Sequence, residues 1–358
     1  MTLVNCAHHA TPGGFLEPFL GPGYRWHHVS ATAELSNPVL RRVRKPDLKR
    51  VVGCFRAAKL AGEVQADLLI THDPRVTFPT EHFRRMLGVP VPHLAYSFNY
   101  PWIPGGWKGW AHRKAFETVT RFVVYSTLER KLYHEKLGIP LEKLDFVHWG
   151  VGPPKDDGTP PPSPFRGGDY VCALGENSRD YATLMAAMRR LPHIPLVMVV
   201  RPHNLVGLEV PANVKVLTSI PFPAAMAVLR HCRFMALPLT GPDVPCGHVT
   251  LVNAMYLGKA MAITDSSGVS DYCRHEDNAL LVPAGSAEAM AAAIERLWDD
   301  GALCRRLGEA GRHFAETVCT EANIVSNFRR LLGVLGLAET AAGGAAAGGG
   351  AAVVRTGA

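Results

Sequence analysis

The sequence lacks any hydrophobic run that could cross a membrane and any recognisable secretion signal. No apolar stretch approaches the roughly 20 residues that a membrane-spanning helix needs. The first residues, MTLVNCAHHATPGG, have neither the basic start nor the long apolar core of a signal peptide. The eight cysteines are scattered without a Cys-x-x-Cys pair, which argues against a structural zinc site. We therefore expect a cytoplasmic protein with reduced thiols.

Charged side chains are also scarce, at 19% of the chain, and two charge-bearing motifs are missing. No Asp-x-Asp motif occurs, so we expect no bound metal. No basic–aromatic stacking pattern occurs, so we do not expect nucleic acid as a partner. The net charge of +7 is concentrated in the first half. Residues 1–150 hold 20 Lys and Arg against 12 Asp and Glu, whereas the rest of the chain holds 18 against 19.

The densest basic segment, residues 41–59, is predicted to contain an amphipathic helix. Its cationic side would carry Lys49, Arg50, Arg56 and Lys59, and its apolar side Val51, Val52 and Phe55. Such a helix is typical of a protein that touches a membrane surface or binds an anionic acceptor. A solvated helix face explains the same pattern, so both interpretations stay open.

The hydrophobic pattern predicts an α/β protein. In both halves, short apolar runs of strand length alternate with segments of helical periodicity, which indicates parallel sheets. The elements predicted from this alternation include a short helix at 80–87 and a strand at 146–149 that closes the first half. Two Rossmann-like domains of similar size would face each other across a central cleft, where ligands bind.

Composition places the domain boundaries. Residues 151–168 are crowded with Pro and Gly, which do not fit inside a helix or a central strand, so they form a linker. The domains would then cover residues 1–150 and 169–336. Residues 337–358 are low in complexity and have little to bury, so we expect a disordered tail.

Residues 233–264 carry the clearest local sign of a ligand site. They parse as a strand, a loop rich in Gly and Pro, a helix and a second strand. The loop delivers backbone N–H groups and the hydroxyl of Thr250 to the start of a helix, where the dipole and the unpaired amides favour an anion. A phosphate or diphosphate is therefore the expected ligand, although many loops of this kind bind nothing.

Three blocks in the second half resemble the donor domain of family 4 glycosyltransferases, also known as group 1 glycosyltransferases, which have the GT-B fold. The blocks are GHVTLVNAMYLGKAMAIT at 247–264, SSGVSDY at 266–272 and NALLVPAGSAEAMAAAI at 278–294. GENSRDYATLMAA, at 175–187, is similar to the family's block after the first strand of this domain. The first half is similar in outline only. The resemblance implies that residues 1–150 bind an acceptor and residues 169–336 a nucleotide-sugar.

The resemblance also implies a donor site. Arg179 stands where the family has a basic residue that contacts the donor diphosphate, and Arg201, at a strand end, is a second candidate cation. The N-terminus of the loop-borne helix would cap the diphosphate and contact the sugar through Gly247, His248, Val249 and Thr250. For either arginine, an ordinary surface position is the alternative.

The chain departs from the family at its paired glutamates. Pro245 occupies the place of the first Glu and Asn253 that of the second, which contacts the ribose in the family. Asn253 can still donate to and accept from a hydroxyl. Pro245 can do neither, so sugar contacts would come from the amides near Gly247 or from Asp243.

The acceptor side is expected at the strand ends of the first half. His72 follows the buried run DLLIT, which suits a general base or a hydrogen bond to the acceptor. The acceptor-binding candidates are Gly13, Gly14, Asp73, Asn99 and Tyr100. Packing, loop support or a simple turn is the alternative for each of these residues.

The expected activity is transfer of a sugar from a nucleotide-diphosphate donor to a glycan, lipid-linked or small-molecule acceptor. The resemblance implies retention of configuration, no metal and no cofactor beyond the donor itself. The expected location is the cytoplasm, with peripheral contact to the inner membrane through residues 41–59. A sugar-nucleotide epimerase and a non-catalytic nucleotide- or glycan-binding protein are the alternatives.

Overall fold

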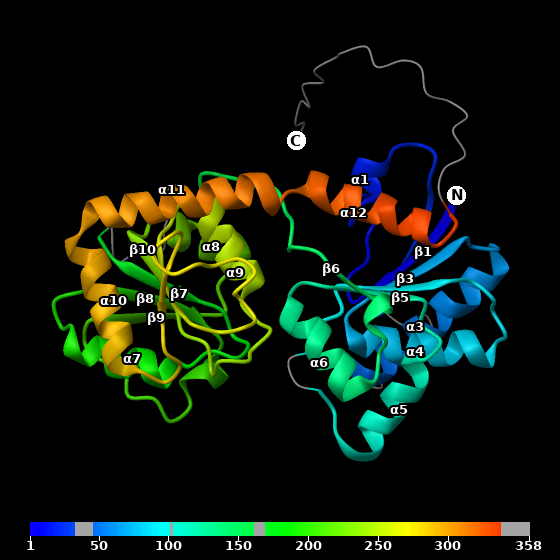
Figure 1. The fold of residues 1–358 in the computed structure, drawn as a ribbon, viewed down its shortest axis with the longest axis horizontal. Coiled ribbons are helices and arrows are strands. Elements are labelled where there is room, and N and C mark those ends of the chain that lie inside the picture. The colour runs from blue at the N-terminus through cyan, green and yellow to red at the C-terminus, as the bar shows by residue number, and fades with distance from the viewer. Residues whose placement is uncertain (33–45, 101–102, 161–168, 338–358) are drawn as a thin grey trace, which may run out of the picture.

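The computed structural model describes residues 1–32, 46–100, 103–160 and 169–337, which form two α/β domains side by side (Figure 1). Each domain is built on a six-stranded sheet with helices on both faces, and the strand pairs are parallel throughout. The predicted α/β class with two Rossmann-like domains is confirmed.

The first sheet has the strand order β2-β1-β3-β4-β5-β6. Its strands are β1 (Thr2–Ala7), β2 (Arg25–Ser30), β3 (Leu68–His72), β4 (His93–Tyr96), β5 (Arg121–Val124) and β6 (Leu144–Phe146). The helices around it are α1 (Glu17–Leu20), α3 (Pro46–Glu63), α4 (Pro74–Met86), α5 (Gly106–Phe116) and α6 (Thr127–Leu137), with a 3₁₀ turn, η1, at Leu141–Lys143. The inner strands read as near-continuous apolar runs because both faces of a parallel sheet are covered.

The second sheet has the order β12-β11-β10-β7-β8-β9. Its strands are β7 (Val171–Leu174), β8 (Leu196–Val200), β9 (Val214–Thr218), β10 (Phe234–Leu237), β11 (Met261–Thr264) and β12 (Leu280–Val282). The helices are α7 (Tyr181–Arg190), α8 (Phe222–His231), α9 (His248–Tyr256), α10 (Ala287–Asp299), α11 (Gly301–Val318) and α12 (Glu321–Val334), with a 3₁₀ turn, η2, at Pro202–Leu205.

Two predicted elements were placed wrongly. Helix α4 begins at Pro74 and not at residue 80, because Asp73 accepts a hydrogen bond from the Arg75 amide and caps the first turn. Pro74 fits there because the first helical position needs no N–H donor. The strand expected at 146–149 ends at Phe146, since the backbone then leaves the sheet and the Trp149 amide donates to the Tyr272 hydroxyl of the second domain at 2.7 Å.

The chain crosses between the domains twice. Residues 151–160 of the predicted linker have no regular structure, and residues 161–168 and the predicted tail from 338 onwards lie outside the described residues. The second crossing joins α11, on the second domain, to α12, which lies on the first (Figure 1). Ile324, Phe328 and Leu331 of α12 share a core with strands β1, β3 and β4, so this helix clamps the two domains together.

Helix α3 only partly matches its predicted amphipathic pattern. Its buried side consists of small residues, Cys54, Ala57, Ala58 and Ala61, and not of Val51, which is 38% exposed. Lys59 is paired with Glu63 at 3.2 Å, and residues 41–45 lie outside the described part of the chain. Among the described residues, no helix is long and apolar enough to cross a membrane.

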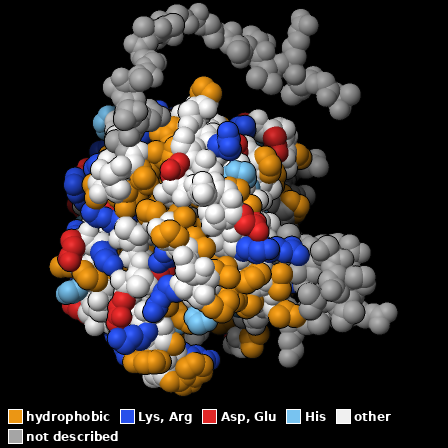
Figure 2. Space-filling model, turned by 90° about the vertical axis from the view of Figure 1, so that its right-hand side faces the viewer, with side chains coloured by type: hydrophobic (Ala, Val, Ile, Leu, Met, Phe, Trp, Pro, Cys, Tyr) orange, Lys and Arg blue, Asp and Glu red, His pale blue; other side chains and the backbone are white. Residues whose placement is uncertain are grey.

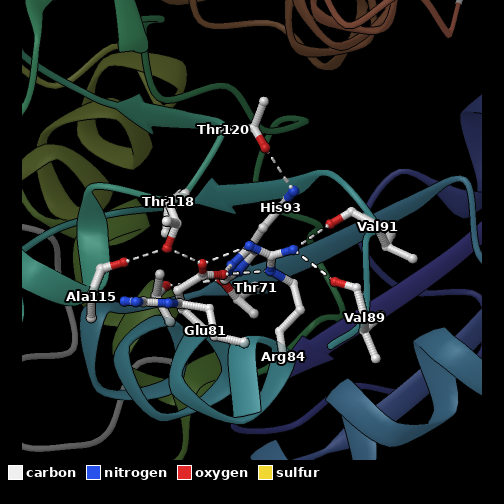
Figure 3. A network of polar contacts seen from close by, with 12 residues as sticks. Thr71, Glu81, Arg84, Val89, Val91, His93, Ala115, Thr118 and Thr120 are labelled. Carbon is white, nitrogen blue, oxygen red and sulfur yellow. Dashed lines mark hydrogen bonds and ion pairs between the residues drawn. The ribbon is translucent and has the colours of Figure 1, made fainter. Parts of the chain in front are cut away.

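A buried charged cluster ties α4 to the first sheet (Figure 3). Glu81, on α4, is fully buried and accepts hydrogen bonds from Arg84 Nη2 at 2.8 Å, His93 Nδ1 at 2.7 Å and Thr118 Oγ1 at 2.5 Å. Burial would raise the pKa of this carboxyl, but the donors from Arg84, His93 and Thr118 outweigh burial and lower the pKa to about 2. The cluster therefore holds an ionised carboxylate in the core, beside His93 at the amino end of β4 and Thr118 shortly before β5.

Candidate active site

Three adjoining cavities lie along the cleft between the domains. The first, of about 610 Å³, lies mainly on the first domain, the middle one, of about 340 Å³, touches both domains, and the third, of about 390 Å³, belongs to the second domain. Ser97, Asn99, Tyr125 and Trp149 line both the first and the middle cavity. Gly175, Glu176, Val249 and Thr250 line both the middle and the third. The three cavities thus form one path past the carboxyl ends of both sheets.

Arg179 is the central cation of this path. Its guanidinium donates to the backbone oxygens of Leu174 at 3.3 Å and Asn177 at 2.7 Å, and approaches the Thr250 hydroxyl at 3.4 Å. All of these partners are neutral, and no carboxylate among the described residues forms an ion pair with Arg179. Burial lowers the pKa of this group but leaves it a cation, since arginine titrates far above neutral pH. The side chain therefore presents an uncompensated positive charge to the middle cavity.

The N-terminus of α9 faces the same cavity. Gly247 caps the helix with φ +107°, a conformation that a residue with a side chain adopts only under strain, so glycine is needed at this turn. The following residues His248, Val249 and Thr250 line the middle cavity, and the first amides of a helix have no intrahelical partner. Arg179 and the end of α9 together form an anion site of the kind expected for a diphosphate.

His248 is fixed under the helix end. Its Nε2 donates to the backbone oxygen of Gly268 at 2.7 Å, and its ring lies 4.9 Å from that of Tyr272. Burial lowers its pKa to about 4, so the ring is neutral at physiological pH. A neutral His248 supports the loop and can contact a sugar, but it adds no charge to the anion site.

Two predicted donor residues are placed less directly. Arg201 lines the third cavity but is ion-paired with Glu176 at 2.9 Å, so its charge is already balanced. The side-chain amide of Asn253 donates a hydrogen bond to the backbone oxygen of Val249, within α9, at 2.7 Å. Asn253 lines none of the three cavities. Glu176 lines two of the cavities, and sequence reasoning did not single it out, although it stands in the block GENSRDY.

His72 lies at the end of β3 and lines the first cavity. Its Nε2 donates to Asn5 Oδ1 at 3.0 Å, and its Nδ1 faces the Ser97 hydroxyl at 3.3 Å, which in turn contacts the Tyr125 hydroxyl at 2.7 Å. Burial and the nearby His28 lower the pKa of His72 to about 4. The residue is thus a neutral imidazole whose free lone pair points to Ser97. Asn5 and Ser97 were missed because neither belongs to a motif.

Asp73 and Ser97 both have positive φ angles, 72° and 49°, although neither is glycine. Such angles are uncommon outside glycine and concentrate at functional sites. Burial would raise the pKa of Asp73, but hydrogen bonds from His8 and Arg75 outweigh it and hold the pKa far below its usual range. The first cavity therefore contains a permanent carboxylate beside neutral His72.

The other acceptor-side candidates divide into two groups. Gly14 and Asn99 line the first cavity. Gly13 and Tyr100 line none of the three cavities: the Gly13 amide donates to Glu17, and Tyr100 is buried with its hydroxyl 2.5 Å from His112 Nδ1.

Asn99 also joins the two domains. Its amide nitrogen donates to the backbone oxygen of Pro245 at 2.8 Å and to the buried carboxylate of Glu129 at 2.5 Å. Burial raises the pKa of Glu129 to about 7, although the hydrogen bonds to it oppose that shift. Beside this contact, Asp271 accepts hydrogen bonds from the amide of Thr127 at 2.8 Å and from its hydroxyl at 3.0 Å. The first domain thus contacts two loops of the second, the loop before α9 through Asn99 and the loop after β11 through Thr127.

Among the described residues, no group of three or more His, Cys, Asp or Glu side chains is arranged to hold a metal ion. The absence of a bound metal stays a prediction.

One part of the second domain matches a known family. Residues 206–314 match the family model of the group 1 glycosyl transferases. No curated protein matches the chain significantly.

Among solved structures, sucrose-phosphate synthase from Thermosynechococcus elongatus is similar over 93% of this chain and 99% of its own, with 16% identity and a TM-score of 0.70. Alr3699/HepE from Anabaena in complex with UDP-glucose is similar over 93% and 100%, with 14% identity and a TM-score of 0.68. A glycosyltransferase from Rickettsia africae is similar over 93% and 98%, with 12% identity and a TM-score of 0.64. At these identities the likeness establishes the fold. The chain therefore has the GT-B fold, and its residues 206–314 carry the sequence pattern of the group 1 glycosyltransferases.

Proposed function

We propose that this protein is a glycosyltransferase that moves a sugar from a nucleoside-diphosphate donor to an acceptor, with retention and without a metal. The observation that carries the proposal is the uncompensated guanidinium of Arg179 beside the N-terminus of α9, in the middle of the cleft. Departure of the nucleoside diphosphate develops negative charge on its phosphates. A cation and unpaired amides already in place stabilise that charge.

In this proposal each part of the reactants lies in a different stretch of the three cavities. The nucleoside fits the third cavity, between β8 and α9, and the diphosphate lies at Arg179 and Thr250. The sugar occupies the middle cavity under the amides that follow Gly247, and the acceptor enters the first cavity near His72 and Asp73. The UDP-glucose bound to the similar Anabaena protein supports a nucleotide-sugar as the donor.

The acceptor is a glycan, a lipid-linked sugar or a small molecule with a free hydroxyl. Neutral His72, whose two ring nitrogens contact Asn5 and Ser97, orients that hydroxyl through Ser97. No further cofactor is needed for this chemistry. We place the protein in the cytoplasm, with the basic segment 41–59 as a proposed contact to the inner membrane.

A thermal-shift screen tests the donor site. The ligands are UDP, GDP, ADP, TDP and the UDP- and GDP-linked sugars, because a ligand that binds only the folded state raises the melting temperature. We expect one nucleotide class to raise it, and we expect Arg179→Ala and Thr250→Ala to lose the shift. Arg305→Ala, on the exposed side of α11, is the matched control and should keep the shift. No shift with any nucleotide would overturn the assignment.

One observation favours a second candidate, a non-catalytic nucleotide- or glycan-binding protein. Pro245 and Asn253 replace the family's paired glutamates, and Asn253 lines none of the three cavities. Release of nucleoside diphosphate that depends on an acceptor would exclude this candidate.

An epimerase would need acid–base carboxylates beside the sugar. Among the described residues that line the middle cavity, the only carboxylate is Glu176, which is ion-paired with Arg201. A new sugar-nucleotide formed without acceptor would support an epimerase in place of the transferase.

A further inference from the structure

Helix α5 exposes two tryptophans on the outside of the first domain. Trp107 is 75% exposed and Trp110 is 56% exposed, although tryptophan is usually among the most buried residues. Their spacing of three residues places them on the same side of the helix. Neither lines any of the three cavities of the cleft.

These tryptophans are not needed to anchor the helix. The opposite side of α5 is already packed, because Ala115 and Phe116 lie in a core with Phe98 and Phe122. Gly109 lies so close to the Pro104 carbonyl that an added Cβ would be 2.4 Å from its oxygen. The two indole rings therefore extend from a helix that is held without them.

Cations surround the two rings. Lys108, Arg113 and Lys114 are all exposed on α5, and the Lys108 ammonium lies 5.9 Å from the Trp107 ring centre. Glu117, the residue that follows α5, is paired with Lys114 at 2.9 Å. We call these five residues, Trp107, Lys108, Trp110, Arg113 and Lys114, the α5 surface.

The end of α4 extends the same face. The Arg85 guanidinium donates to the backbone oxygen of Lys114 at 3.3 Å, so the two helix ends lie side by side. Next to Arg85, Met86 is 60% exposed and Leu87 is 40% exposed. Figure 2 shows hydrophobic side chains with Lys and Arg beside them at the bottom of the molecule, the level at which Figure 1 draws α5.

We propose that the α5 surface docks the protein on an anionic membrane. Indole rings have an apolar body and an N–H donor, which suits the boundary between headgroups and acyl chains. Lysine and arginine beside them match the negative charge of anionic headgroups. The 11 residues of α5 span roughly 16 Å, so the helix lies along the membrane plane and inserts only its tryptophans.

A protein partner fits the surface less well. Exposed lysines lie beside the rings, and lysine is depleted from the cores of protein interfaces. The tryptophans stand on the outside of the helix and line none of the three cleft cavities. The apolar and cationic groups occur together on one helix face, as a charged lipid surface requires.

This surface also differs from the segment 41–59. Among the described side chains of α3, the exposed large apolar residue is Val51, at 38%, and α3 has no exposed aromatic ring to match the two tryptophans of α5. Helix α5 follows the strand β4 and the cleft residues Ser97 and Asn99 in the chain, with Gly106 seven positions after Asn99. At no more than about 3.5 Å per residue, the start of α5 lies within about 25 Å of the cleft. A membrane bound at α5 is thus close to the first cavity.

Vesicle flotation with the full chain tests the proposal, and it needs no nucleotide, so its result is independent of the proposed activity. The probes are vesicles of phosphatidylcholine alone and of phosphatidylcholine mixed with phosphatidylglycerol. We expect binding to the anionic vesicles only, and we expect it to weaken with added salt. The double variant Trp107→Ala/Trp110→Ala should weaken it at least tenfold, and Lys108→Gln/Lys114→Gln should weaken it several-fold.

Two further variants make the test specific. Val206→Ala removes another apolar residue, 80% exposed on the second domain, and should bind as the wild type does. Lys49→Gln/Arg56→Gln addresses the segment 41–59. The proposal is overturned if no vesicle is bound, if the double tryptophan variant binds normally, or if only the Lys49/Arg56 variant loses binding. It is also overturned if the α5 surface binds single-stranded nucleic acid and not vesicles. Unchanged melting temperatures would show that the variants are folded.

Discussion

The buried carboxylate of Glu81 should be among the most sensitive positions in the first domain. Glu81→Ala would leave His93 Nδ1, the Arg84 guanidinium and the Thr118 hydroxyl without their shared acceptor inside the core (Figure 3). Removing one partner of a buried ion pair costs about 3–5 kcal/mol, because the remaining charge stays buried without compensation. The pKa supports the same scale: lowering it from 4.5 to about 2 corresponds to about 3 kcal/mol.

The assay is urea unfolding, monitored by a probe in the first domain. It compares the free energy of unfolding of the wild type with that of Glu81→Ala, Glu81→Gln and the control Glu117→Ala. Glu117 forms an exposed pair with Lys114, so its loss should change the free energy of unfolding by less than about 1 kcal/mol. The folded pKa of Glu81 is depressed, so its stabilisation is complete above pH 4.5 and disappears as the pH falls toward 2. The gap between the wild type and Glu81→Gln should therefore close in that window. If Glu81→Ala is as mild as Glu117→Ala, the cluster does not hold a buried charge.

Three other predictions concern the cleft. Arg179→Met should weaken binding of the nucleoside diphosphate, measured by calorimetry, about 10- to 150-fold, because a hydrogen bond to a charged group contributes about 1.5–3 kcal/mol. A change of less than twofold would remove Arg179 from the site. His72 has a pKa of about 4 and stays neutral from pH 5 to 8, so its ring signals in NMR spectra should not titrate there, and a titration near 6.5 would contradict the buried environment. Asp271→Ala removes the acceptor for the Thr127 amide and hydroxyl, so the two domains should separate more easily, seen as a larger radius of gyration in X-ray scattering. Unchanged scattering would show that α12 and the remaining contacts between the domains are enough to set the arrangement.

The sheet architecture was predictable because each strand and helix carries its own local signal. The run at β3 is apolar on both faces and is bounded by polar residues, and α6 begins at a capping Ser126 and ends at Gly138 in the left-handed conformation. The start of α4 was missed because its cap is Asp73, a residue that the sequence interpretation assigned to the acceptor site. The packing of α12 on the first domain depends on contacts with residues more than 200 positions away, which periodicity does not reveal.

The candidate site was predictable at the level of segments but not of side-chain direction. Adjacent residues in one loop illustrate this: Asn99 lines two cavities, whereas Tyr100 is buried with its hydroxyl on His112. In α9, Thr250 faces the cleft and Asn253 turns its amide back to the helix. Which way a side chain points at a strand or helix end is decided by the three-dimensional neighbours, and those come from distant parts of the chain.

The contacts between the domains add a constraint that the family resemblance alone does not suggest. In the block SSGVSDY, Asp271 and Tyr272 contact the first domain: Asp271 binds Thr127, and the Tyr272 hydroxyl donates to the backbone oxygen of Tyr125 at 2.7 Å. Asn99 holds the Pro245 carbonyl two residues before Gly247. The loop before α9 is therefore held by Asn99 of the first domain, and the loop after β11 is held by the start of α6. In this chain, Pro245 stands at the position of the family's first Glu, and its backbone oxygen links the loop before α9 to the first domain.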